Sequence, residues 1–364
     1  MFDKELIRKM SKDIIDSFHL RGFEVELTNV CNFKCVYCGS DVGNAADAKD
    51  LKILPFETVK RVVDEMKHPV WVGFSGGEPT LPFCLPNLLK SIEYAKEKGG
   101  CTELFTNGSA GLKTVEKLAD AGLDVYHVSL PTLNPEKFTS LRLSDEKMLK
   151  HILEGVTFAL ESTRMSVTVE TLAVKDLLNE IPDLYDYWSG LGVKTFEVQT
   201  PVPLGRMDEK LLPDTRQFID VLKNLYERRT PRTTIKVNCL WFTCLHPEIM
   251  HILSEILFEE CECGTHTLNI KADGKVTICP FAGFSVGDIR KQTLKEIYDS
   301  DFLRKYRATF NDDCYSCLLF KNCHGRCRLM SYMQDKDFSK KPYGLLKETY
   351  CSMKPNQTQR RDAE

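Results

Sequence analysis

Three cysteines near the start of the chain have a spacing suited to iron-sulfur chemistry. Cys31, Cys35 and Cys38 lie on one short loop after a strand-like run over residues 23–28, and the next cysteine is Cys84. Thiolates spaced in this way can hold three corners of a cubic cluster, whereas a closed structural site would want a fourth thiolate nearby. The remaining iron stays free for an outside ligand. Taken alone, the loop is also compatible with a chance cysteine cluster or a zinc knuckle.

The loop resembles the signature of the AdoMet radical (radical SAM) superfamily. Its spacing is C-x3-C-x-(aromatic)-C, with Tyr37 as the aromatic residue. In that family the free iron binds the amino and carboxylate groups of S-adenosylmethionine (SAM), and an electron from the cluster splits the sulfonium to give a 5'-deoxyadenosyl radical. The resemblance implies a [4Fe-4S] cluster on Cys31, Cys35 and Cys38, SAM as cofactor, and an electron donor such as flavodoxin or ferredoxin.

Later strand ends extend this resemblance. The run over 70–75 leads into a Gly-Gly-Glu-Pro segment, where glycines let the backbone approach a ligand closely. At position 77 we expect that the methionine part of SAM and a positive φ both exclude a side chain. By resemblance, the cofactor-binding residues are Tyr37, Gly76, Gly77, Glu78, Pro79, Asn107, Ser129 and Arg142. The alternatives are a simple turn for the glycine pair and an exposed loop residue for the arginine. The sequence names no catalytic acid or base.

Strand-like and helix-like runs alternate from residue 23 onward. The strand-like runs are 23–28, 70–75, 101–106, 124–130, 164–171 and 193–200, and the helix-like runs are 55–67, 86–98, 111–121, 145–160, 176–191 and 213–229. Six β-then-α units in succession predict an α/β fold with a parallel sheet and an outer helical layer. A partial (β/α)6 TIM barrel is preferred over a doubly wound sheet. In both folds the chemistry belongs at the carboxyl ends of the strands.

One face of the predicted strands is polar. The residues on that face are Glu26, Thr28, His127, Ser129, Thr168, Glu170, Glu197 and Gln199. The opposite face carries Val25, Leu27, Val128, Val167, Val169, Phe196 and Val198. A filled barrel would have bulky aliphatic side chains inside. The pattern therefore predicts a polar cavity that suits SAM and a polar substrate, although the strand with Glu103 fits it poorly.

Ten of the fifteen cysteines follow Asn238. Their pattern resembles the SPASM extension, C-x(9 to 15)-G-x4-C, then C-x2-C-x5-C-x3-C, then C. The resemblance implies two auxiliary [4Fe-4S] clusters, one on Cys261, Cys263, Cys279 and Cys327 and the other on Cys314, Cys317, Cys323 and Cys351. The fourth ligand of the first cluster stays open, because Cys239 or Cys244 is an alternative. Zinc ribbons are the structural alternative for the C-x2-C pair.

Composition limits the partners and the organisation. The 364 residues include 49 Lys and Arg against 52 Asp and Glu, a formal charge of -3, with no basic stripe for nucleic acid or a membrane surface. The charged N-terminus lacks a signal peptide, and the odd number of closely spaced cysteines favours a reducing cytoplasm. We predict an N-terminal helix at 1–22, the barrel at 23–230, the SPASM domain at 231–355 and a disordered tail at 356–364.

The resemblance implies a class of reaction more clearly than a substrate. SPASM enzymes mature peptides or protein side chains, and others act on haem precursors or small molecules. Pro280 follows Cys279 where sulfatase-maturing enzymes have a basic aspartate. About 22 residues precede the first strand, too few for a fused leader-binding domain, so a separate precursor-peptide recognition protein is a candidate partner.

The prediction is an oxidoreductase-type radical SAM/SPASM enzyme that removes a hydrogen atom from a peptide or protein side chain. A small-molecule or haem-pathway tailoring enzyme is the alternative within the class. A non-catalytic, zinc-stabilised binding protein is the alternative of another class. The segment 128–137 resembles the molybdenum-cofactor branch of the family, but the C-terminal cysteines do not follow the spacing of that branch.

Overall fold

A sheet of ten strands organises the computed structural model of this chain. The structure describes residues 12–13, 19–44, 50–238, 252, 255–256, 261–312, 314–316, 320 and 327–339. Within these residues the strand order is β12-β11-β10-β1-β4-β5-β6-β7-β8-β9. A separate pair of two-residue strands, β2 (Val30–Cys31) and β3 (Gly43–Asn44), lies in the cysteine loop.

Seven neighbouring strands run parallel and form the barrel wall. They are β1 (Gly22–Glu26), β4 (Trp71–Ser75), β5 (Cys101–Thr106), β6 (Val125–Ser129), β7 (Ser166–Leu172), β8 (Thr195–Gln199) and β9 (Thr234–Asn238). The first six match the predicted strands to within three residues at each end. The seventh, β9, was not predicted, because only Ile235 and Val237 are apolar and buried in it.

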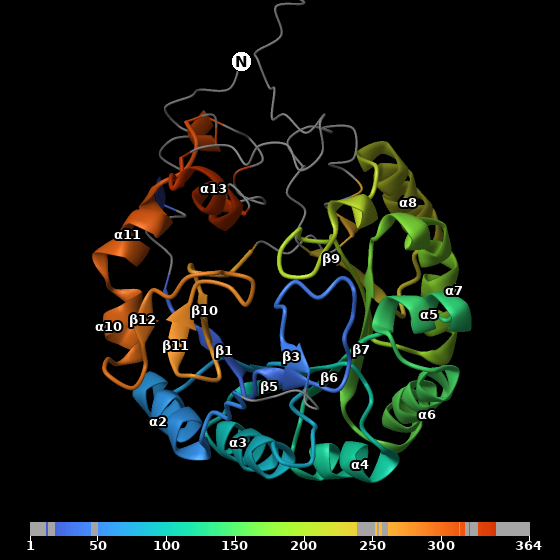
Figure 1. Cartoon of the computed structure of the whole chain (residues 1–364), viewed down its shortest axis with the longest axis horizontal. Helices are drawn as coiled ribbons and strands as arrows, with labels where there is room; N and C mark the ends of the chain where they lie inside the picture. Colours follow the sequence, from blue (N-terminus) through green and yellow to red (C-terminus); the bar gives the residue numbers. More distant parts are fainter. Residues whose placement is uncertain are drawn as a thin grey trace, which may run out of the picture.

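Helices follow the strands and form an outer layer, as Figure 1 shows. They are α2 (Phe56–Met66), α3 (Leu85–Glu97), α4 (Leu112–Asp120), α5 (Pro135–Arg142), α6 (Glu146–Ser162), α7 (Ile181–Leu191) and α8 (Thr215–Arg228), with 3-10 turns η2 (Lys175–Glu180) and η3 (Glu209–Leu211). Two differ from prediction. The extra helix α5 begins at a favourable cap, because Asn134 accepts from the Lys137 amide and proline follows it. The run predicted at 176–191 begins as a 3-10 turn ahead of Pro182.

The strand alternation separates a polar interior from an apolar shell. The residues predicted to face outward, from Val25 to Val198, all belong to the buried core and are at most 1% exposed. Helices supply the matching stripe; in α2 it consists of Val59, Val62 and Val63. The other face of the same strands lines a cavity. The predicted α/β fold, a partly closed parallel sheet with outer helices, is confirmed.

The C-terminal region continues the barrel sheet. Strand β10 (Thr267–Ile270) pairs in parallel with β1, and Gly22 lies opposite Thr267. Antiparallel pairing then adds β11 (Lys275–Thr277) and β12 (Gly287–Asp288). The helical segments that follow are α10 (Leu294–Tyr298), α11 (Asp301–Ala308), η6 (Cys314–Ser316) and α13 (Arg328–Asp335). The predicted domain boundaries remain predictions.

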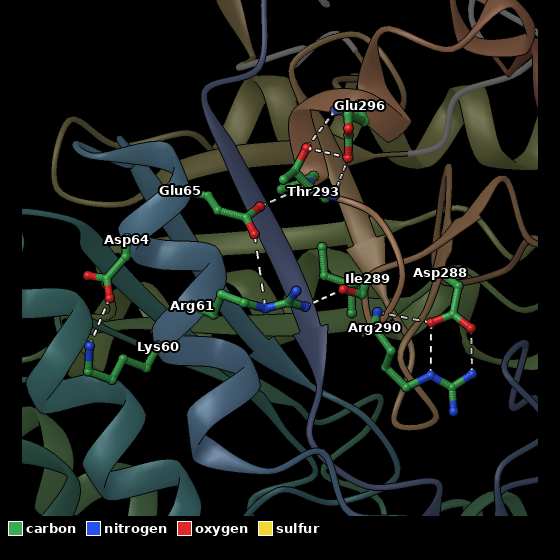
Figure 2. Close-up of polar contacts among 10 residues, drawn as sticks. Lys60, Arg61, Asp64, Glu65, Asp288, Ile289, Arg290, Thr293 and Glu296 are labelled. Carbon is green, nitrogen blue, oxygen red and sulfur yellow. Dashed lines mark hydrogen bonds and ion pairs between the residues drawn. The ribbon is translucent and has the colours of Figure 1, made fainter.

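Polar contacts fasten this C-terminal region to α2, as Figure 2 shows. Arg61 donates to the Ile289 carbonyl, and the Glu65 carboxylate accepts from the Leu294 amide at 2.9 Å. That amide opens α10, whose first turn is also closed by a capping box between Thr293 and Glu296. Because α2 directly follows the cysteine loop in the chain, these contacts position the C-terminal region beside the loop.

The predicted N-terminal helix at 1–22 lies mostly outside the described residues, although Lys12 and Asp13 are helical. The predicted tail at 356–364 lies outside them entirely. In the described part of the chain, no helix combines the length and apolar character needed to span a membrane.

Candidate active site

One large cavity occupies the interior of the barrel and reaches the C-terminal region. Its volume is about 1010 Å³. The cysteines that line it are Cys31, Cys35, Cys38, Cys261, Cys263, Cys279 and Cys327. Of the predicted cofactor-binding residues, Tyr37, Gly76, Gly77, Asn107, Ser129 and Arg142 line it too. The structure therefore brings together residues that lie up to 296 positions apart, from Cys31 to Cys327.

The N-terminal cysteine loop presents its thiols to this cavity under conditions that disfavour free thiolates. Cys31 is 6% exposed, and burial raises the pKa of its thiol to about 12. Burial also raises the pKa of Cys35. The Cys31 sulfur accepts from the Phe33 amide at 3.3 Å and from Asn107 Nδ2 at 3.5 Å. Metal binding deprotonates such thiols, and hydrogen bonds to the sulfurs tune a cluster, so this donor set suits an iron-sulfur group.

The glycine pair packs directly against the strand that leads into Cys31. The Gly77 amide donates to the Thr28 carbonyl at 2.7 Å, and a Cβ at Gly77 would lie 1.8 Å from the Val30 carbonyl oxygen. The positive φ, 136°, belongs to Gly76. The expectation of a positive φ at position 77 was therefore wrong. What excludes a side chain there in this structure is the close approach of the Val30 backbone.

Glu78 and Pro79, predicted in the cofactor-binding set, do not line the cavity. Glu78 is fully buried, and its carboxylate accepts from the Thr80 amide and hydroxyl at 3.0 and 2.6 Å. It also accepts from the Thr106 hydroxyl and the Asn107 amide, both at 2.8 Å. Burial raises the pKa of Glu78, and these hydrogen bonds oppose that rise. Through these hydrogen bonds Glu78 connects the end of β5 to the glycine loop.

Arg142 ends α5 and lies deep in the wall of the cavity. It is 2% exposed, its guanidinium donates to the Ser129 carbonyl, and a second bond reaches the Ser129 hydroxyl at 3.2 Å. The rings of Phe33 and Phe138 flank it at 5.4 and 6.0 Å. Its buried Nε has no hydrogen-bond partner within the described structure. A buried cation with an unused donor suits an anionic ligand group, so the exposed-loop alternative for this arginine is wrong.

Cysteines of the C-terminal region gather at the far end of the same cavity. The Cys263 thiol lies within hydrogen-bonding reach of Cys261 and Cys279, and this contact raises its pKa. Tyr306 borders these thiols and Cys327, and its hydroxyl donates to the Cys263 carbonyl at 3.2 Å. Cys314 lies in η6 and does not line the cavity. The other predicted ligands, Cys239, Cys244, Cys317, Cys323 and Cys351, lie outside the described residues.

Acidic side chains cover the wall formed by β5 to β9. We define the acidic wall as Glu103, His127, Glu170, Glu197 and Lys236. His127 Nδ1 lies 2.9 Å from Glu103 Oε1, and His127 Nε2 lies 3.8 Å from Glu170 Oε2. Lys236 Nζ is 3.6 Å from Glu197 Oε2. Burial would lower the pKa of His127, but the surrounding carboxylates outweigh it and raise that pKa to about 9. These carboxylates therefore favour the protonated imidazole.

A second acidic pair lies across the cavity on β1. Glu24 accepts from the Ser75 hydroxyl, and burial raises the pKa of Glu24 to about 7. Glu26 has a cationic partner, because Lys271 Nζ lies 2.5 Å from its Oε1. Asn269 of β10 also donates to Glu26 at 3.3 Å. The C-terminal strand thus helps to compose the interior of the barrel.

The predicted polar interior was correct for Glu26, His127, Ser129, Glu170, Glu197 and Gln199, all of which line the cavity. Sequence reasoning missed Glu24, Lys236 and Lys271, and it set Glu103 aside. Glu24 lies two residues before Glu26 and therefore on the same face of the strand, so the alternation of side chains would have predicted it. Glu103 was obscured by Phe105, which shares its face and packs on His127 at a centroid distance of 4.7 Å. No local pattern predicts Lys236 or Lys271.

Two family models match the chain. The radical SAM superfamily model matches residues 25–187, and the model of an iron-sulfur cluster-binding domain, SPASM, matches residues 261–324. AdoMet-dependent heme synthase of Methanosarcina barkeri is 26% identical over 349 residues, covering 91% of this chain and 95% of that protein. A probable GTP 3',8-cyclase of Methanococcus maripaludis is 31% identical over 175 residues, 48% of this chain and only 56% of that protein.

Solved structures show the same fold. The crystal structure of Streptococcus suis SuiB bound to S-adenosylmethionine matches with a TM-score of 0.71 at 20% identity, covering 93% of this chain and 81% of that chain. Native anSMEcpe with bound AdoMet matches with a TM-score of 0.64 at 16% identity, covering 88% of this chain and 92% of that chain.

The chain belongs to the radical SAM superfamily and carries a SPASM domain. It is an enzyme, and the two domains imply a [4Fe-4S] cluster, auxiliary clusters and SAM. The predictions of family, fold and cofactors are confirmed. The alternative of a zinc-stabilised binding protein without catalysis is not supported.

Proposed function

We propose that this enzyme cleaves SAM reductively and removes a hydrogen atom from an unactivated carbon of a peptide or protein side chain. The observation that carries the proposal is the single cavity. The N-terminal cysteine loop, the glycine pair, Arg142, the acidic wall and the cysteines of the C-terminal region all open onto it. A substrate in this space reaches the SAM site and the auxiliary cysteines together.

In this proposal each group at the strand ends has a defined task. Cys31, Cys35 and Cys38 hold the radical cluster, and the backbone at Gly76 and Gly77 meets the amino group of SAM. Arg142, with its unused buried Nε, binds the SAM carboxylate. When bound, cluster and SAM supply the radical chemistry, while the protein contributes orientation and exclusion of water. Cys261, Cys263, Cys279 and Cys327 hold the first auxiliary cluster, and Cys314, Cys317, Cys323 and Cys351 hold the second.

A peptide is preferred because the cavity is large and combines an apolar lining with ionisable side chains on β5 to β9. Its volume of about 1010 Å³ is at the upper end of the range for a site that holds one drug-sized ligand. SuiB, which shares this fold, has been solved bound to its precursor peptide SuiA. The proposed partners are a peptide substrate, an electron donor such as flavodoxin or ferredoxin, and a separate precursor-peptide recognition protein.

The second candidate is a haem-pathway or other small-molecule reaction. It is favoured by the match to AdoMet-dependent heme synthase, which extends over 91% of this chain. Haem precursors carry several carboxylates, however, and such a substrate would meet the acidic wall with like charge.

Anaerobic reconstitution tests the radical site. With SAM and a reductant, we expect brown protein with about twelve iron atoms per chain, for three cubane clusters, and formation of 5'-deoxyadenosine. Replacing Cys31, Cys35 and Cys38 together with Ala should abolish 5'-deoxyadenosine and leave most of the remaining iron bound. Cys101→Ala is the matched control, because Cys101 is exposed and outside every proposed ligand set. Zinc in place of iron, or equal turnover in the triple variant, would refute the proposal.

A further inference from the structure

We propose that the acidic wall binds a basic group of the substrate, an ammonium or a guanidinium. This inference rests on the proposed function and names the substrate class more narrowly: a peptide with a lysine-like or arginine-like side chain near the carbon that reacts. The acidic wall would bind that side chain, and the proposed SAM site lies next to it at the adjacent strand ends.

Charge balance is the first observation. On the acidic wall itself three carboxyl groups, Glu103, Glu170 and Glu197, face two basic groups, His127 and Lys236. Arg142, another cation that lines the cavity, already donates to Ser129. With His127 protonated and all three carboxyls ionised, the wall carries one uncompensated negative charge. Buried charges normally have partners, so the wall can accept one further cation.

An unbonded carboxylate oxygen on the acidic wall is the second observation. Glu197 is 2% exposed, and within the described structure its Oε2 has no hydrogen-bond partner. The distance of 3.6 Å from Lys236 Nζ to Glu197 Oε2 is an ion pair without a hydrogen bond. A buried acceptor left without a donor is unfavourable, and a bound ammonium or guanidinium would supply the missing donor.

The position of Glu170 places the proposed cation site next to the proposed SAM site. It lies on β7 beside Ser129, whose hydroxyl hydrogen-bonds it, and it also interacts electrostatically with Arg142. Burial raises the pKa of Glu170 to about 7, and the repulsion from Glu197 adds to that rise despite the nearby His127. A ligand cation near Glu170 would relieve this repulsion. A substrate held there therefore lies within the part of the cavity that borders the proposed SAM site.

A metal ion is the main competing ligand, and the surroundings favour an organic cation. His127, Glu170 and Glu197 offer ligand atoms within 4.8 Å of one another. Lys236, however, lies 3.6 Å from Glu197 and would repel a divalent ion more strongly than a singly charged organic cation. Aromatic rings also line this space, with Trp71 and Phe105 6.3 Å apart between centroids. Aromatic faces suit ammonium and guanidinium groups through cation-π contacts.

The test measures equilibrium binding to the reconstituted holoenzyme with SAM and no reductant, so that no turnover occurs. The probes are pools of N-acetylated tripeptide amides with mixed outer residues and a central lysine, arginine, norleucine or glutamate. Equilibrium dialysis with mass spectrometry gives the bound fraction of each pool. We expect the lysine or arginine pool to bind about tenfold more tightly than the norleucine pool and the glutamate pool to bind least. The stronger of the two cationic pools identifies the basic group.

Variants connect the preference to the acidic wall. Glu197→Gln should bring the ratio of cationic to norleucine binding close to one, and Glu170→Gln provides a second variant if the first folds poorly. Glu116→Gln, an exposed position on α4, is the matched control and should keep the wild-type ratio. Equal binding of all pools, no binding of either cationic pool, or preferred binding of a tetracarboxylate porphyrin would overturn the inference.

A metal control completes the design. Mn²⁺ binding followed by electron paramagnetic resonance should detect no site that depends on Glu197. A tight Mn²⁺ site that Glu197→Gln removes would reassign the acidic wall to a metal and overturn the inference. Because binding is measured without reductant, failure of the radical reaction and failure of this inference give different results.

Discussion

Two regions of the barrel hold buried carboxylates in opposite ways. Behind the glycine loop, Glu78 is saturated by hydrogen bonds from Thr80, Thr106 and Asn107. On the acidic wall, Glu197 keeps a buried oxygen that receives no hydrogen bond from the described residues. The glycine loop is thus held in place before any ligand binds, as preorganised sites require. The acidic wall keeps an acceptor that a ligand can use, which is the property of a surface that selects its ligand by charge.

The largest expected effect comes from disrupting the glycine loop. In Gly77→Val the new Cβ would lie 1.8 Å from the Val30 carbonyl oxygen, so the backbone that leads into Cys31 must move. We expect SAM binding to be lost, together with iron at the radical site. Equilibrium SAM binding and iron content measure this. Gly190→Val is the control, because a Cβ there meets nothing within 4 Å; equal loss in both variants, or normal SAM affinity in Gly77→Val, would contradict the close packing of this loop.

A smaller effect is expected from Glu78→Gln. An amide can keep its oxygen at the Oε1 position, which accepts from Thr80 and Thr106, but its NH2 group then faces the Asn107 amide donor, which costs about 1 to 3 kcal/mol. Because the loss misaligns the glycine loop without removing it, SAM affinity should fall about tenfold while the clusters remain. Isothermal titration with SAM measures the change. Unchanged affinity would mean that the loop is held without this carboxylate.

The last change concerns the acidic wall and acts through pH. Glu170 has a pKa near 7 in the folded protein against an ordinary value of 4.5, so its stabilising contribution is present below pH 4.5 and lost as pH rises through 7. Glu170→Gln removes that loss, on the order of 3 kcal/mol at pH 8. Thermal unfolding by circular dichroism should show a higher Tm than wild type at pH 8 and little difference at pH 4.5. An equal shift at both pH values would remove the electrostatic explanation.

Local sequence patterns were enough to predict most of the barrel and part of the candidate site. Alternation of apolar and polar residues along β6, β7 and β8 set which side chains face the cavity, because one register error would move them all to the other face. The same pattern could not predict that the Glu78 carboxylate supports the glycine loop, because the sequence of a turn does not show which way a side chain points. Nor could it show that Gly76 rather than Gly77 has the positive φ. Both depend on the Thr28 and Val30 backbone, far away in the chain.

The pairing of β10 with β1 was also beyond local pattern, because Gly22 and Thr267 meet only through the finished fold. Lys271 and Asn269 reach Glu26 for that reason alone. The parts of the site that sequence reasoning missed are thus mainly those made by contacts between distant segments, which carry no local signal.

That pairing has a consequence for biosynthesis. Strand β1 leaves the ribosome early and can pair with β4, but its other edge has no partner until Thr267 has been translated. An uncovered strand edge is a site for aggregation, and such distant pairing forms slowly. The sheet beside the cysteine loop is therefore completed only after Thr267 has been translated. Iron and sulfide delivered to the nascent chain before that point would meet an unfinished pocket, so we expect cluster assembly to follow the synthesis of β10.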